Sequence, residues 1–177
     1  MKIIAFGASS SRKSINKTLA AYASSLVDGA KTELLDLNDY EIPIFSEDKE
    51  AEIGQPQLAK DFLAKIGSAD AVIVSFAEHN GSYTAAYKNL FDWASRISRE
   101  VFQNKPAIFL STSPGPGGAS NVLQSASQSA QYFGGEVKGS LSIPSFYENF
   151  DMDAGELNDP DIKQQLTQTM DKLLVSV

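Results

Sequence analysis

The chain has 177 residues, about the length of one domain, and its 42% apolar and 21% charged residues are typical of a globular protein. Its 22 acidic and 15 basic residues give a formal net charge of -7, and no basic face indicates a nucleic-acid binder. The absence of cysteine excludes disulfides, thiolate zinc sites, iron–sulfur clusters and cysteine nucleophiles, and the single histidine, His79, leaves no two-histidine metal site. No apolar run is long enough for a signal peptide or a membrane span. We therefore expect one cytoplasmic domain over residues 1–177, with no metal and no nucleic-acid or membrane partner.

The hydrophobic pattern alternates between strands and helices. In chain order it predicts a strand at Lys2–Phe6, a helix at Ile15–Val27, a strand at Lys31–Leu37, a long acidic loop at Asp39–Gln55, a helix from Pro56 to Ile66, a strand at Ala71–Phe76, a helix at Thr84–Ile97, a strand at Ala107–Ser111, a helix at Asn121–Phe133, a strand at Glu136–Leu141 and a helix at Asp161–Leu174. Ser14 is the expected N-cap of the first helix. Strands that alternate with helices in this way predict a parallel α/β sheet.

Three of the predicted strands end directly in polar loops rich in Ser, Gly, Asn or Pro. These loops are Ser9–Ser14, Glu78–Ser82 and Ser113–Gly118. In open α/β sheets the loops at the carboxyl ends of the strands are where ligands bind. We therefore expect the three loops to converge on one pocket.

The first loop lies where a strand passes into a helix, the usual position of a phosphate-binding loop. The dinucleotide pattern G-x-G-x-x-G fails, because Gly7 lacks the second and third glycines. The Walker pattern fits at Lys13 and Ser14 but has Arg12 where a glycine is needed. What remains is a set of side-chain donors aided by the helix dipole: Ser9, Ser11, Ser14 and Asn16. The alternative is that serine merely caps the helix.

All three loops carry motifs of one known family. The stretch from Ala8 to Asn16, A-S-S-S-R-K-S-I-N, resembles the G-S-x-R-x-x-S-x-N phosphate motif of the NADPH-dependent FMN reductase family, which includes chromate, quinone and azo-dye reductases. Asn80-Gly81-Ser82, followed by K-N-L-F-D-W up to Trp93, resembles its second signature, P-E-Y-N-G-S and then L-K-N-A-I-D-W. The turn from Ser113 to Gly118 is similar to its S-P-G-x-x-G-G turn. The resemblance covers about residues 2–141.

The chain departs from the family pattern at several motif positions. Ala8 and Ser11 stand where the family usually has glycine and arginine, and Ala77 and His79 replace its proline and tyrosine. Tyr83-Thr84-Ala85 replaces the usual proline-glycine. The change from tyrosine to His79 bears on how the flavin ring packs and on which acceptors fit.

The resemblance implies a flavodoxin-like three-layer sandwich with a five-stranded parallel sheet in the order 2-1-3-4-5. It also implies FMN as the cofactor and NADPH or NADH as the co-substrate. The phosphate is then expected on the first loop, the ring edge on the second, and the ribityl or pyrimidine side on the third. The expected cofactor contacts are Ser9, Ser11, Ser14, Ile15, Asn16, Glu78, His79, Asn80, Gly81, Ser113, Gly117 and Gly118. Flavin N5 is then the reactive centre and no catalytic side chain is assigned; His79 is either a surface or capping residue or a modulator near the flavin.

The implied function is an FMN-dependent NAD(P)H oxidoreductase that takes a hydride at N5 and passes electrons to a quinone, azo, flavin or metal-oxyanion acceptor. Two alternatives stay open: a flavodoxin-like electron carrier without NAD(P)H activity of its own, and a module that keeps the fold but has lost the flavin.

Tyr83, Tyr87 and Phe91 share a helical face that by default packs in the core, and Trp93 is expected there too. In the family the corresponding helix contributes to a subunit interface, so the resemblance favours a homodimer or homotetramer. Candidate contacts for the 2′-phosphate of NADPH, or else plain surface residues, are Arg12, Lys13, Arg96 and Arg99.

Overall fold

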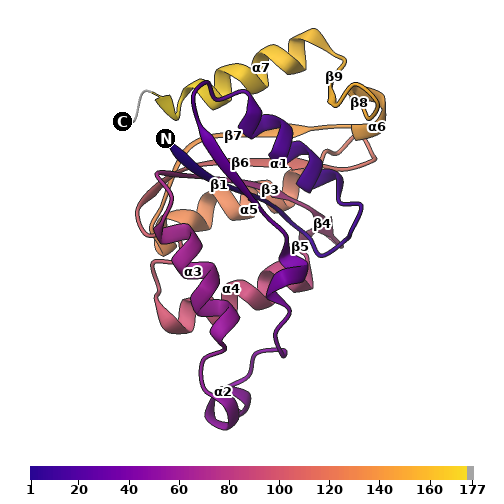
Figure 1. Ribbon diagram of the computed structural model, residues 1–177. Coiled ribbons are helices and arrows are strands. Elements are labelled where there is room, and N and C mark those ends of the chain that lie inside the picture. The colour runs from indigo at the N-terminus through magenta and orange to yellow at the C-terminus, as the bar shows by residue number, and fades with distance from the viewer. Residues whose placement is uncertain (175–177) are drawn as a thin grey trace.

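Figure 1 shows the computed structural model of the protein, which describes residues 1–174. Its centre is a five-stranded parallel sheet in the order β2-β1-β3-β6-β7. The strands are β1 (Lys2–Ala8), β2 (Lys31–Leu35), β3 (Ala71–Phe76), β6 (Lys105–Thr112) and β7 (Gly135–Ile143). When these five strands alone are numbered in chain order, their order across the sheet is 2-1-3-4-5, so the predicted flavodoxin-like order is confirmed.

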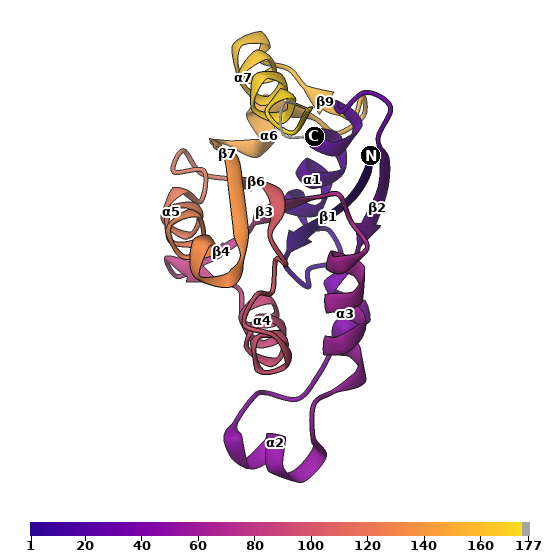
Figure 2. The same cartoon turned by 90° about the vertical axis from the view of Figure 1, so that its left-hand side faces the viewer.

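Helices cover both faces of the sheet, which makes three layers (Figure 2). One face carries α1 (Ile15–Ser25) and α7 (Pro160–Asp171); the other carries α3 (Gln57–Gly67), α4 (Ala85–Ile97) and α5 (Ser120–Ser129). Side chains alternate between the two faces along β1. Ile3 and Ala5 pack in the core under α1 and α7, whereas Ile4 and Phe6 pack in the core under the other three helices. Both faces are buried at the central strands β1, β3 and β6, which is why these three strands are largely continuous apolar runs rather than alternating ones.

Local chemistry explains where the helices begin. Ser14 is the N-cap of α1, because its Oγ accepts a hydrogen bond from the Lys17 N–H (3.1 Å), as expected. Pro160 is the first residue of α7, where its missing N–H and fixed φ do no harm. Gly7 lets α1 lie close against β1, since a Cβ there would be 2.4 Å from the Lys17 backbone nitrogen.

The prediction of a long loop at Asp39–Gln55 is wrong. The segment contains the end of a 3-10 turn, η1 (Leu37–Tyr40), and a short helix, α2 (Glu47–Ile53). Ser46 caps α2 by accepting from the Lys49 N–H, and Glu47, Asp48 and Glu50 lie in its first turn, where the helix dipole favours negative charge. The acidic residues that suggested a solvated loop are therefore the ones that stabilise this helix.

The segment around α2 forms an arm that projects from the body of the molecule (Figures 1 and 2). Trp93 anchors it by donating from Nε1 to the Pro43 carbonyl (2.7 Å), and its ring meets the Phe45 ring edge-on at a centroid distance of 5.1 Å. Arg96 adds an ion pair with Glu50 (2.9 Å). Trp93 is fully buried, so its expected place in the core is confirmed. Arg96 lies on α4 and pairs with the arm, away from the loops of the predicted pocket.

Three further segments differ from the sequence-based expectation. The predicted loop Glu78–Ser82 contains a hairpin, β4 (Glu78–His79) and β5 (Ser82–Tyr83). The predicted helix Asn121–Phe133 is split into α5 and a 3-10 turn, η2 (Ala130–Phe133). The segment before the last helix forms a one-turn helix, α6 (Phe146–Asn149), and a small pair of strands, β8 (Phe150–Asp151) and β9 (Glu156–Leu157). Within residues 1–174, no helix combines the length and the apolar character needed to cross a bilayer.

Candidate functional site

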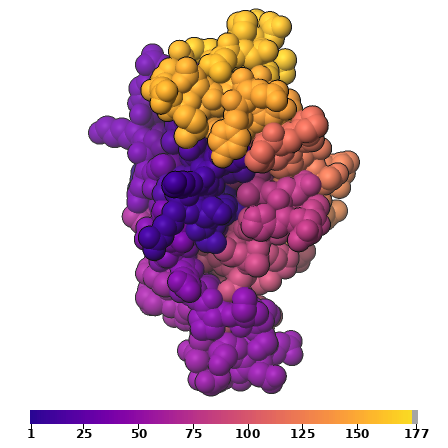
Figure 3. Space-filling model, turned by 90° about the vertical axis from the view of Figure 1, so that its right-hand side faces the viewer, coloured from indigo at the N-terminus to yellow at the C-terminus, as the bar shows by residue number. Residues whose placement is uncertain are grey.

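The three polar loops do meet at the carboxyl edge of the sheet. Residues from all of them line one open hollow of about 270 Å³, which we call the loop hollow. Its lining residues are Ser9, Ser11, Lys13, Ser14, Ile15, Asn16, Ala77, Glu78, His79, Thr112, Ser113, Pro114 and Tyr147. Figure 3 shows a face of the molecule where the indigo N-terminal segment lies between the magenta segment that follows β3 and the gold segment that follows β7.

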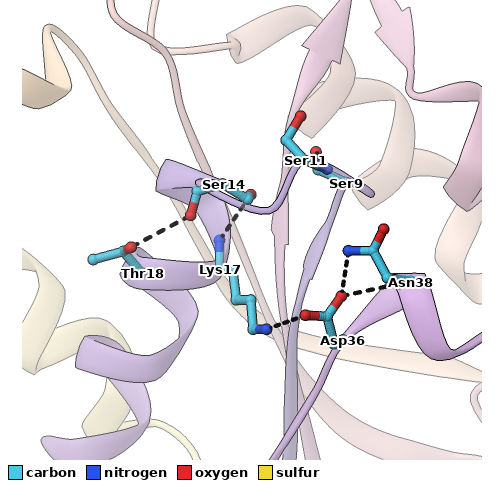
Figure 4. A network of polar contacts seen from close by, with 7 residues as sticks. All are labelled: Ser9, Ser11, Ser14, Lys17, Thr18, Asp36 and Asn38. Atoms are coloured by element: carbon cyan, nitrogen blue, oxygen red, sulfur yellow. Dashed lines mark hydrogen bonds and ion pairs between the residues drawn. The ribbon is translucent and has the colours of Figure 1, made fainter.

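The first loop presents three hydroxyl groups that are able to donate (Figure 4). The Ser14 Oγ accepts from the Lys17 N–H, and the Ser9 Oγ accepts from the Ser11 N–H (3.1 Å). Each of these bonds uses the oxygen as acceptor and leaves the hydroxyl hydrogen for another partner. Ser11 is exposed and its hydroxyl is not engaged by any group within residues 1–174. The loop therefore has the donors that a phosphate needs.

The electrostatics of this loop also favour an anion. The first backbone N–H groups of α1, at Ile15 and Asn16, have no partner inside the helix and carry its positive dipole end. Arg12 and Lys13 are exposed and form no ion pair with the described residues, and residues 9–18 include no carboxylate. In a chain of net charge -7, this is a local site of positive potential.

Lys17 does not add to that potential, because it is paired. Its Nζ forms an ion pair with Asp36, which follows β2. The hydrogen bonds from Lys17 and from the Asn38 backbone N–H lower the pKa of Asp36 to about 2. This pair holds α1 against the end of β2, as Figure 4 shows.

Asn16 lines the loop hollow and also has a structural role. The side chain is 2% exposed and ties three elements together. Its Oδ1 accepts from the Ser75 hydroxyl (2.8 Å) and the Thr112 N–H (3.1 Å), and its Nδ2 donates to the Thr112 carbonyl (3.1 Å). Asn16 thereby fixes α1 against the carboxyl ends of β3 and β6.

The second loop is a tight hairpin whose shape depends on Asn80 and Gly81. Both have positive φ, 53° and 79°, as a two-residue Asn-Gly hairpin turn requires. Glu78 fixes the base of this hairpin, because its carboxylate accepts from the Val122 N–H (2.9 Å) and from Asn121 Nδ2 (3.3 Å) at the start of α5. His79 is exposed on the rim of the loop hollow and caps no helix among the described residues.

The third loop folds back on itself. The Ser113 hydroxyl donates to the Gly115 carbonyl (3.1 Å). Gly118 has φ 58°, and its carbonyl accepts from the hydroxyls of Ser111 (2.7 Å) and Ser142 (2.8 Å), while a Cβ there would be 2.3 Å from Ser142 Oγ. Gly118 is thus required for packing this loop onto β7.

The predicted contacts and the lining of the loop hollow overlap in part. Asn80, Gly81, Gly117 and Gly118 lie in the three loops but do not line the hollow. The expected cofactor contacts did not include Ala77, Thr112, Pro114 and Tyr147, and Lys13 was considered in the rejected Walker pattern and as a contact for NADPH. Tyr147 carries no local signal, because it lies in a segment whose small elements were not predicted. Thr84 was also missed as a positioning residue: its hydroxyl donates to the Ala8 carbonyl (2.9 Å) and joins the start of α4 to the end of β1, directly before the first loop.

Comparison with known proteins places the chain in a family. Residues 1–148 match the NADPH-dependent FMN reductase family, and the chain belongs to it. FMN and NAD(P)H are the cofactors of this family of oxidoreductases, as the motifs implied. The chain is 34% identical to an NAD(P)H-dependent FMN reductase of Pseudomonas aeruginosa over 116 residues, 65% of this chain and 61% of that protein. It is 32% identical to a 2-hydroxy-1,4-benzoquinone reductase of a Burkholderia species, over 65% of this chain and 62% of that protein. The matches therefore span less than two thirds of these two relatives.

Solved structures agree with the fold. FerB of Paracoccus denitrificans, described as a flavoenzyme NAD(P)H:(acceptor) oxidoreductase, superposes with a TM-score of 0.77 and 25% identity, covering 98% of this chain and 95% of that one. A mutant flavodoxin from Pseudomonas aeruginosa gives a TM-score of 0.59 at 14% identity, covering 98% and 99% of the two chains. The second likeness shows the fold alone.

Proposed function

We propose that this protein is an FMN-dependent NAD(P)H oxidoreductase that passes electrons to a small acceptor, a quinone in the first instance. The observation that carries the proposal is the first loop. Its three available hydroxyls, Lys13 and the start of α1 all lie at one hollow beside the Asn80–Gly81 hairpin. Arg12 is next to Lys13 in the chain, and neither forms an ion pair within residues 1–174. The FMN phosphate carries about two negative charges and one cluster of acceptor oxygens, and this loop matches both.

Each loop has its own task in binding. The hydroxyls of Ser9, Ser11 and Ser14, with the N–H groups of Ile15 and Asn16, hold the phosphate. The hairpin that includes His79 offers backbone groups to the ring edge, and Ser113 bounds the ribityl side. When bound, FMN supplies the redox chemistry, taking a hydride at N5 from NAD(P)H and passing electrons to the acceptor.

His79 is the candidate modulator of the acceptor step. Its imidazole is exposed, lines the loop hollow and makes no hydrogen bond within residues 1–174. An imidazole in this position can give a proton to an acceptor that is being reduced.

In keeping with the family resemblance, we also propose that the chain works as a homodimer or homotetramer in the cytoplasm. Sedimentation velocity measures the association state.

The test begins with the visible spectrum of purified protein after addition of FMN. Flavin extracted from the washed protein should be FMN; recovery of FAD alone would contradict the phosphate assignment. Addition of NADPH or NADH without oxygen should then bleach the bound flavin, and a quinone should restore its colour. Steady-state rates at several fixed quinone concentrations should give parallel double-reciprocal lines, because nicotinamide and acceptor alternate at one face of the ring. A protein that binds FMN but is bleached by neither nicotinamide is an electron carrier instead.

A further inference from the structure

A second hollow, which we call the aromatic pocket, lies between α4 and α5 on the sheet face opposite α1. Its volume is about 320 Å³, and none of its lining residues is shared with the loop hollow. Besides Tyr87, its walls include the rings of Phe76, Tyr83, Phe91, Phe102, Phe109 and Phe133. Many of these rings contact one another edge-on or tilted, as Phe91 and Phe133 do at a centroid distance of 4.8 Å. Pockets of this size and character are typical of small-molecule sites.

Tyr87 places one polar group in these apolar walls. The residue is 4% exposed, and its ring packs on Phe76 (5.4 Å) and Phe91 (5.7 Å). No group within residues 1–174 hydrogen-bonds its hydroxyl. This hydroxyl therefore has no protein partner, and an acceptor atom placed next to it would gain a hydrogen bond. Burial also raises the pKa of Tyr87 well above its usual range, so the hydroxyl stays protonated and able to donate.

The Tyr87 hydroxyl is directed to the pocket rather than sealed in the core. Among the described residues, the side-chain oxygens that are both cut off from solvent and unpaired belong to Tyr22 and Ser127. Tyr87 is not one of them, so its hydroxyl reaches open space, and the open space that Tyr87 lines is the aromatic pocket. A ligand atom in the pocket can therefore supply the missing hydrogen bond.

The remaining polar groups of the pocket are already engaged among the described residues. The Tyr83 hydroxyl lies 3.4 Å from the Ser129 Oγ, and the Ser95 hydroxyl donates to the Asp92 carbonyl (2.8 Å). The Ser125 hydroxyl donates to the Asn121 carbonyl (3.1 Å), and the Ser129 hydroxyl donates to the Ala126 carbonyl (3.3 Å). At the edge of the pocket, Lys88 and Asp92 form an ion pair with each other (2.7 Å). Since these two charges cancel, the pocket offers no counter-charge to an ionic ligand.

We propose that the aromatic pocket binds a small, flat, uncharged aromatic molecule whose single oxygen forms a hydrogen bond with Tyr87. The aromatic walls favour a flat ring, because aromatic pairs gain from offset and edge-on contacts. The single available hydroxyl sets the number of polar anchors at one, and the neutral edge excludes an ion. This proposal does not rest on the proposed reductase function, because the pocket is separate from the loop hollow.

The test uses 2-naphthol as the probe, with calorimetric titration of the protein saturated with FMN. We expect one site per chain, and we expect naphthalene-2-sulfonate, with the same rings and a negative charge, to bind at least about tenfold more weakly. Tyr87→Phe keeps the ring and removes the hydroxyl, so 2-naphthol should bind about tenfold more weakly while naphthalene binds as before. Tyr132→Phe is the matched control, because Tyr132 is 61% exposed and lies outside the pocket. A circular dichroism spectrum checks that each variant is folded.

Two results would overturn the proposal. One is equal affinity of 2-naphthol for wild type and the Tyr87→Phe variant, which would place the binding elsewhere, for example on the flavin itself. The other comes from Ser129→Phe, which fills the pocket from α5 and should abolish 2-naphthol binding without changing the sedimentation coefficient. If this variant instead changes the association state, the pocket is covered by a second copy of the chain and is not a ligand site.

Discussion

Ser14 has two roles that different substitutions separate: it caps α1 and it faces the proposed phosphate position. Ser14→Ala removes the bond from the Lys17 N–H (3.1 Å), which lowers the free energy of unfolding by about 1 kcal/mol. It also removes a donor to a charged phosphate, worth about 1.5 to 3 kcal/mol. FMN should therefore bind about 10- to 150-fold more weakly to this variant.

Ser14→Asp tests the same position without loss of the cap. Aspartate is as good an N-cap as serine, so the free energy of unfolding should stay near that of wild type. Its carboxylate would, however, face the phosphate, and two like charges about 4 Å apart repel by about 4 kcal/mol at the effective dielectric near a protein surface. FMN binding should fall about 1000-fold while the stability of α1 is kept.

The assay pairs urea unfolding of FMN-free protein with fluorescence titration of FMN. Ser46→Ala is the matched control, because Ser46 caps α2 by the same kind of bond (3.0 Å) and lies outside the loop hollow. It should lose some stability and keep its FMN affinity. If Ser14→Asp binds FMN like wild type, the phosphate lies elsewhere. If it is as unstable as Ser14→Ala, the assignment of the cap is wrong.

Three further predictions concern the scaffold of the site. Gly7→Ala should lower the free energy of unfolding by about 1 to 3 kcal/mol, because its Cβ meets the Lys17 backbone, whereas Gly117→Ala, where a Cβ meets nothing within 4 Å, should not; equal urea midpoints would contradict this. The lowered pKa of Asp36, about 2 against an ordinary value of 3.8, stabilises the fold above pH 3.8, and this stabilisation is lost as the pH falls toward 2. Asp36→Asn should therefore be less stable than wild type by about 1 kcal/mol near neutral pH and equally stable near pH 2; a gap in urea stability that does not change with pH would refute this. Glu78→Ala should weaken FMN binding and lower stability by about 1 to 2 kcal/mol, since it frees the hairpin from the Val122 N–H, and Glu78→Gln should have a smaller effect; equal losses would contradict the hydrogen-bond argument.

Much of the scaffold follows from local sequence. Runs such as Ala71–Phe76, which is apolar except at Ser75, indicate buried strands, because a strand covered on both faces shows no alternation of apolar and polar residues. The order of strands, loops and helices then brings the first residues of each loop to one edge of the sheet, and Ser14 caps its helix wherever that helix packs. The Asn80-Gly81 pair is also a local signal for a two-residue hairpin turn, although only a loop is predicted there from the sequence.

Tertiary packing decided the rest, because the relevant bonds join residues far apart in the chain. The motif predicts the amide of Asn16 as a phosphate donor, but its bonds to Ser75 and Thr112, 59 and 96 residues away, have no signal in the local sequence. The arm around α2 depends on Trp93 reaching the Pro43 carbonyl, 50 residues away, and no local pattern encodes that contact. Tyr87 fits a core stripe by its helical spacing alone. Only the packing of α4 beside α5 leaves a pocket at its hydroxyl, because two helices on one sheet face need not fill the space between them.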